Sequence, residues 1–107
     1  MSRAWTEEEI REQFLDHVRN TIDYWKTVDL DLKVFPNEDE LTRRMNGLAF
    51  SILTALDGEA MAVPGFKVIP NSHPDDKQYY IDNGENWYPD DIDIGGCLHE
   101  ELDIHKS

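Results

Sequence analysis

The stretch ELTRRMNGLAFSILTALDG, residues 40–58, decides the predicted fold. Its apolar residues recur at steps of three or four, which is the period of a helix that buries one face. This stripe consists of Leu41, Met45, Leu48, Ile52 and Leu56. Further apolar residues widen the face, so we predict that a helix over residues 38–56 is the most buried element. Gly58 follows Asp57 and can take the left-handed conformation that ends a helix.

A second helix is predicted upstream, in the segment AWTEEEIREQFLDHVRNTIDYWKTV. Thr6 and Glu9 form a capping box, in which each side chain accepts a hydrogen bond from the backbone N–H of the other residue. Apolar residues again follow at helical spacing, namely Ile10, Phe14, Val18, Ile22 and Trp25. For the helix over residues 38–56, Asn37 with Glu40 is the expected cap. Gly47 in its middle costs about 1 kcal/mol relative to Ala, which indicates close approach of the other helix or of a sheet.

Short β-type segments separated by turn residues fill the second half of the chain. The predicted strands are Phe66–Ile69, Gln78–Asp82 and Asn86–Tyr88, with further pieces near Val28–Val34 or Ile92–Ile94. Asn83-Gly84 is a strong hairpin signal, and a small sheet needs three or more strands to be stable. We therefore predict an α+β fold, in which two N-terminal helices pack on a small, mainly antiparallel sheet.

The length of 107 residues predicts a single domain. Its helical half covers residues 1–58 and its strand and loop half covers residues 59–107. The segment that follows Cys97 fits either a short helix or a strand, with Glu100 and Glu101 near its start favouring a helix.

The charge of the chain is strongly negative, at −13. Such a surface repels the phosphate backbone, so direct binding of nucleic acid is not expected, and it favours a basic protein partner. The acidity is concentrated in residues 70–105, which hold ten carboxylates and one basic side chain, Lys77. No run of residues is apolar enough to cross a membrane, no signal peptide is evident, and Cys97 is the one cysteine. These features predict a cytoplasmic protein.

Several segments resemble a group of small bacterial and phage proteins classed as a domain of unknown function. The segments are RRMNGLAFSILTALDG, PGFKVIP, HPDDKQYYIDNGENWYP and DIGGCLHEEL. They contain the Leu-Asp-Gly, Pro-Gly-Phe and Gly-x-Leu-His-Glu motifs of that group and cover residues 43–102. The resemblance implies a small independent domain and assigns no catalytic residue.

An aromatic cluster in the acidic half is the first candidate site. Tyr79, Tyr80, Trp87 and Tyr88 lie within ten residues and are flanked by acids. Strand alternation would put the two adjacent tyrosines on opposite faces, leaving one exposed. Exposed aromatics with an acidic rim suit a protein interface for a basic partner or a pocket for a cationic ligand. Arg43, in a basic pair on the second helix, is a further candidate binding residue.

A metal site is the alternative, with His73, Asp75, Asp76 and His99 as ligands. Histidine and carboxylates bind one transition-metal ion such as Zn²⁺, Mn²⁺ or Fe²⁺. The site requires His73 to meet His99 in space. The LHEEL segment lacks the H-E-x-x-H spacing of zinc peptidases, so the motif itself does not predict an enzyme.

The function that these patterns favour is that of a small acidic interaction protein without catalysis or cofactor. A binder or inhibitor associated with a phage or mobile element would fit. The alternatives are a metal-dependent enzyme or metal-binding protein, which would use the His73 and His99 set, and a small-ligand domain with an aromatic pocket. The helical half could also form a homodimer, because its aromatic stripe is wide for so small a core.

Overall fold

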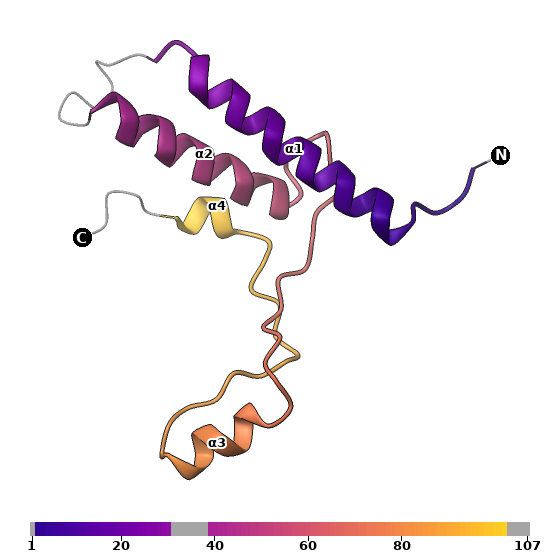
Figure 1. Ribbon diagram of the computed structural model, residues 1–107, viewed down its shortest axis with the longest axis vertical. Coiled ribbons are helices and arrows are strands. Elements are labelled where there is room, and N and C mark those ends of the chain that lie inside the picture. Colours follow the sequence, from indigo (N-terminus) through magenta and orange to yellow (C-terminus); the bar gives the residue numbers. More distant parts are fainter. Residues whose placement is uncertain (1, 31–38, 103–107) are drawn as a thin grey trace.

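The computed structural model describes residues 2–30 and 39–102, and within these ranges every regular element is a helix. The helices are α1 (Glu7–Thr27), α2 (Glu40–Leu56), α3 (Asp76–Asp82) and α4 (Leu98–Glu101) (Figure 1). The predicted α+β fold is therefore wrong, since the described part of the chain contains no strand and no sheet.

The two predicted helices of the first half are confirmed. Each begins at a cap formed by residues three positions apart in the sequence. The Thr6 hydroxyl accepts the Glu9 N–H at 3.1 Å, and the Glu9 carboxylate accepts the Thr6 N–H at 2.9 Å, which completes the capping box of α1. Helix α2 begins two residues later than predicted. Its cap is Asp39, whose carboxylate accepts the Thr42 N–H at 2.6 Å. Asn37, the predicted cap, lies outside the described residues.

Helices α1 and α2 run side by side and are held together around Trp25 (Figure 1). The indole N–H of Trp25 donates to the Ser51 hydroxyl at 2.9 Å, and its carbonyl accepts from the Arg44 guanidinium at 2.7 Å. The indole ring lies directly over Gly47, where an added Cβ would stand only 2.4 Å from Cη2. The glycine therefore allows a close approach, as its position in the sequence predicted, and of the two partners left open there the neighbour is the other helix.

Helix α2 ends in a Schellman motif, as Gly58 indicated. Gly58 has a φ of 89°, and the N–H of Glu59 donates to the Thr54 carbonyl at 3.1 Å. The chain then folds back along the helix pair. The N–H of Phe66 donates to the Leu56 carbonyl at 2.9 Å, and the Phe66 ring meets the Phe14 ring of α1 edge to face.

The predicted strands Phe66–Ile69 and Ile92–Ile94 are extended neighbours, but they do not form a ladder. Their described backbone contact is the N–H of Ile94 donating to the Val68 carbonyl at 2.8 Å. The Asp93 carboxylate accepts the N–H groups of Val68 and Gly95, both at 2.8 Å. A side chain that takes the backbone donors competes with strand pairing, and Pro70 lacks the N–H that would extend the ladder.

The segment Gln78–Asp82, predicted as a strand, belongs to helix α3. Asn83-Gly84 ends this helix instead of turning a hairpin. The N–H of Glu85 donates to the Tyr80 carbonyl at 2.8 Å, and Gly84 has a φ of 69°. The same dipeptide suits both roles because each requires a residue with positive φ.

The remaining predicted strands are not found in the described ranges either. Asn86–Tyr88 has no regular structure, and Val28 is the C-cap of α1. Residues 31–34 of the predicted Val28–Val34 piece lie outside the described residues. The segment after Cys97, for which helix and strand were both open, is the short helix α4.

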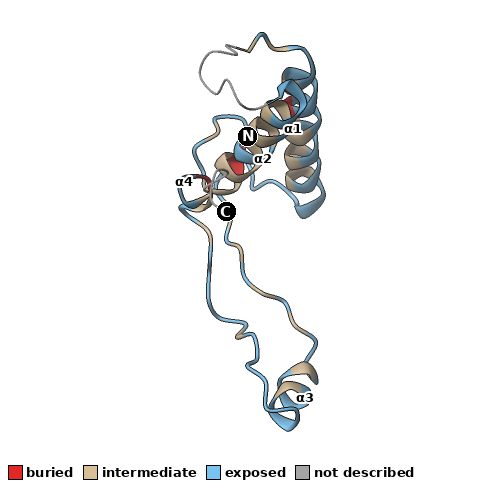
Figure 2. Cartoon of the chain, turned by 90° about the vertical axis from the view of Figure 1, so that its left-hand side faces the viewer, coloured by how far each residue is buried: buried red, intermediate tan, exposed pale blue. Residues whose placement is uncertain are grey.

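The chain has an open shape, because residues 67–96 form a long arm that carries α3 away from the helix pair (Figures 1 and 2). Helix α3 contacts no other helix of the described chain. The radius of gyration is 18.1 Å, whereas a compact chain of this length has about 13 Å. Burial is concentrated where the helices meet, at Thr21, Ala55, Val63 and His99. None of the helices in the described ranges is both long and apolar enough to span a bilayer.

A glycine substitution tests the helix contact. Gly47→Ala would ordinarily stabilise a helix by about 1 kcal/mol. Here we expect the free energy of unfolding to fall by about 1–3 kcal/mol, because the new methyl group overpacks against the indole. Urea denaturation followed by circular dichroism measures this change. In a Trp25→Ala background the same substitution should be neutral or stabilising, so an equal loss in both backgrounds would contradict the contact.

Candidate functional site

A buried carboxylate joins the end of α2 to the start of α4. The Asp57 side chain has no exposed surface. It accepts the backbone N–H groups of Gly96 at 3.1 Å, Leu98 at 3.0 Å and His99 at 2.7 Å. It also lies 2.5 Å from Nδ1 of the His99 ring. Four donors therefore surround one negative charge, which is the arrangement that a buried carboxylate needs.

The other ring nitrogen of His99 faces two more carboxylates. Its Nε2 lies 3.0 Å from Glu59 and 3.9 Å from Glu100. The His99 side chain is 8% exposed, and its ring meets the Phe50 ring edge to face. Glu59 and Glu100 are more than half exposed. We call Asp57, Glu59, His99 and Glu100 the junction site.

Both central groups of the junction site have shifted pKa values. Burial acts to raise the pKa of Asp57, but the N–H of His99, its ring, and the N–H groups of Leu98 and Gly96 outweigh burial and lower it to about 2. The pKa of His99 is raised, first by the hydrogen bond to Asp57, against the effect of burial, and then by the nearby carboxylates. The ionised pair is thus favoured. The stability that Asp57 contributes is present above the ordinary pKa of 3.8 and is lost as the pH falls from there through about 2.

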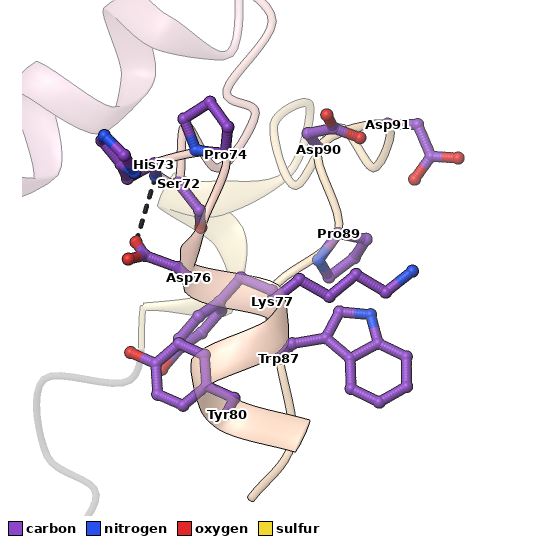
Figure 3. A pocket seen from close by; sticks show the side chains of 11 residues that line it. Ser72, His73, Pro74, Asp76, Lys77, Tyr80, Trp87, Pro89, Asp90 and Asp91 are labelled. Atoms are coloured by element: carbon purple, nitrogen blue, oxygen red, sulfur yellow. Dashed lines mark hydrogen bonds between the residues drawn. The ribbon is translucent and has the colours of Figure 1, made fainter. Parts of the chain in front are cut away.

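The arm tip, residues 72–91, holds the second cluster (Figure 3). It contains a pocket of about 320 Å³ whose lining includes His73, Asp76, Tyr80, Trp87 and Tyr88. The Tyr80 ring lies edge to face against the rings of Tyr79 and Tyr88, at centroid distances of 5.7 Å and 6.1 Å. The ammonium group of Lys77 lies over the Trp87 ring, 5.2 Å from its centre. The structure therefore brings the four predicted aromatic residues together.

The adjacent tyrosines diverge for a reason other than strand alternation. They lie on helix α3, where neighbouring side chains point about 100° apart. Tyr79 is 63% exposed, whereas Tyr80 is half-buried between its two neighbours.

The four predicted metal ligands do not form one site. His73, Asp75 and Asp76 belong to the arm tip, where the Asp76 carboxylate accepts the His73 N–H at 3.1 Å (Figure 3). His99 lies on α4, at the other end of the arm (Figures 1 and 2). His73 and His99 therefore do not meet. Arg43, the further predicted binding residue, is half-buried on α2, away from the arm tip.

Sequence reasoning missed Asp57 and Glu59 as partners of His99. At Asp57 the sequence pattern predicts only the end of a helix. One signal was present, because Asp57 belongs to the Leu-Asp-Gly motif and His99 to the Gly-x-Leu-His-Glu motif. These two segments carried the resemblance to small bacterial and phage proteins, and the structure places them in direct contact.

Comparison with protein families, curated proteins and solved structures finds no match to this chain. The resemblance therefore stays a prediction.

The buried carboxylate can be tested by removing its charge alone. Asp57→Asn keeps the size of the side chain but places an amide N–H₂ group against backbone donors and the His99 ring. We expect the melting temperature at pH 7 to fall by about 5 °C or more. Differential scanning calorimetry measures this change. Asp90→Asn, on an exposed loop residue, is the matched control, and similar melting temperatures for the two variants would refute the structural role.

Proposed function

We propose that this chain is a non-catalytic interaction protein whose arm tip binds a basic surface of another protein. The observation that carries the proposal is the exposure of clustered aromatic rings at the end of the arm. Tyr79 and Tyr88 are each 63% exposed and Trp87 is 46% exposed. Helix α3 has no contact with the other helices in the described ranges, so this surface stands apart from the helix pair (Figure 2).

The chemistry of the cluster suits protein binding. Tyrosine and tryptophan are enriched among the residues that carry most of the binding energy at interfaces, because they bury a large area at little cost in conformational entropy. Tyr80 packs between Tyr79 and Tyr88 and so restrains the orientation of both outer rings. A surface whose rings are held in place before binding loses less freedom when the partner arrives.

The charge around the rings selects the partner. Residues 71–94 contain seven carboxylates and one basic side chain, Lys77. Complementary charge speeds the encounter with a basic surface and disfavours acidic partners, which include nucleic acids. In this proposal the protein acts as a binder or inhibitor in the cytoplasm, where a chain with the single cysteine Cys97 needs no disulfide.

The aromatic pocket fits a small cationic ligand less well than it fits a protein surface. The ammonium group of Lys77 already covers a face of Trp87. A cationic ligand would have to displace this group before it could use the same ring face. The outward faces of Tyr79 and Tyr88 carry no such competitor among the described cation–ring contacts.

Site-specific photocrosslinking tests the proposal. Benzoylphenylalanine replaces Tyr79 or Tyr88 at the arm tip, and Tyr24, which is 56% exposed on α1, provides the control position. We expect crosslinks to one basic protein from the arm tip and not from position 24. With that protein purified, Tyr79→Ala and Tyr88→Ala should each weaken binding at least about tenfold, and Tyr24→Ala should have little effect.

Salt provides the second readout. Raising the ionic strength from about 0.1 M to about 1 M shortens the Debye length from about 10 Å to about 3 Å, and binding should weaken accordingly. Crosslinks that arise equally from position 24, or an affinity that does not depend on salt, would contradict the proposed role of the arm tip.

A further inference from the structure

The junction site has the composition and spacing of a metal centre. Nε2 of His99 and one carboxylate oxygen each from Glu59 and Glu100 lie within 4.8 Å of one another. Imidazole nitrogen and carboxylate oxygen are both ligand types that bind Zn²⁺ and related divalent ions. These three residues differ from the set that the sequence predicted, with which they share only His99.

We propose that Glu59, His99 and Glu100 bind one divalent transition-metal ion, with Zn²⁺ as the best fit, and that Asp57 positions His99 for this role. The site is independent of the arm tip and of the function proposed for it.

The distances suit a tetrahedral ion. Bonds of about 2.1 Å in tetrahedral geometry separate the ligand atoms by about 3.4 Å. The observed separations of His99 Nε2 from Glu59 and Glu100 are 3.0 Å and 3.9 Å, one on each side of this value. Glu59 and Glu100 are 57% and 63% exposed, so both can adjust without disturbing buried groups, and an ion can enter from solvent.

Asp57 contacts the ring nitrogen of His99 that would not bind the metal, as a partner of a metal-binding histidine does. Ligating histidines usually present their second ring nitrogen to a carboxylate, a backbone carbonyl or a water, which fixes the ring and makes the ligand nitrogen more basic. Here Nδ1 of His99 faces the Asp57 carboxylate, whose side chain has no exposed surface, and backbone N–H groups donate to the same carboxylate. Nε2 is therefore the nitrogen directed toward Glu59 and Glu100.

Binding would exchange one proton for the ion. Without metal, a protonated His99 ring pairs with the Glu59 carboxylate, whose oxygen lies 3.0 Å from Nε2. On binding, the proton on Nε2 passes to solvent and the nitrogen lone pair bonds to the metal, with no change of oxidation state. Three protein ligands leave the fourth tetrahedral position for water. Since Glu59 follows α2 and the other ligands lie on α4, the ion would also tie the two ends of the arm together.

Calorimetric titration of chelator-treated protein with ZnCl₂ tests the site, with the visible absorption of Co²⁺ reporting its geometry. We expect one ion per chain, a tetrahedral Co²⁺ spectrum and a higher melting temperature with Zn²⁺. Glu59→Gln and Glu100→Gln keep the size of each side chain and should each weaken binding at least about tenfold, because even changes outside the ligand set cost 10- to 100-fold.

Two controls separate this site from general attraction to an acidic surface. Glu101→Gln changes the neighbouring carboxylate on α4, which is not in the ligand set, and His73→Ala removes the histidine of the arm tip. Both should bind Zn²⁺ as the unchanged protein does. Absence of binding at about 100 μM Zn²⁺, equal affinities for Glu59→Gln and Glu101→Gln, or loss of binding only in His73→Ala would each overturn the proposal.

Discussion

The contact on which the structure depends is the buried Asp57 carboxylate with its donors on the returning chain. It accepts three backbone N–H groups from residues 96–99 and faces Nδ1 of His99. Helix α4 has only four residues, and so short a helix does not persist by itself in water. The carboxylate holds its start against the end of α2. Because the contact joins residue 57 to residues about forty positions later, it closes the intervening chain into one loop and thereby defines the base of the arm.

The arm is extended because its two sides do not pair as a sheet. Asp93 accepts backbone N–H groups that would otherwise form a ladder, and Pro70 interrupts the opposite side. The apolar and aromatic side chains of the tip are therefore not buried against the helix pair. They pack mainly on one another around Tyr80. The rings proposed to meet a partner are exposed for the same physical reason that the sheet is absent.

The arm tip and the junction site place different chemistry at opposite ends of the same loop (Figure 1). The tip has exposed aromatic rings and negative charge, which suit binding to the surface of another protein. The junction site offers a restrained imidazole with two adjustable carboxylates, which suits an ion. Ala55 and Val63 are the only apolar residues of the described chain that count as buried. A ligand that binds only the folded state raises its stability once the ligand concentration exceeds the dissociation constant, and such a gain adds to what so small a core provides.

The sequence by itself determined the features that arise from neighbours along the chain. The Thr6–Glu9 box and the turn at Gly58 follow from contacts over three to five residues. Gly47 indicated close approach of the other helix or of a sheet, and the structure shows that the neighbour is Trp25 of α1. The sequence pattern did not distinguish a strand from a helix at Gln78–Asp82, because a short apolar run fits both periods.

The aromatic cluster could be predicted because its members are close in sequence. The junction site could not, since Asp57 and His99 are 42 residues apart. Only the tertiary structure decided which carboxylates surround that histidine, because a buried charge is stabilised by whichever donors the fold brings to it.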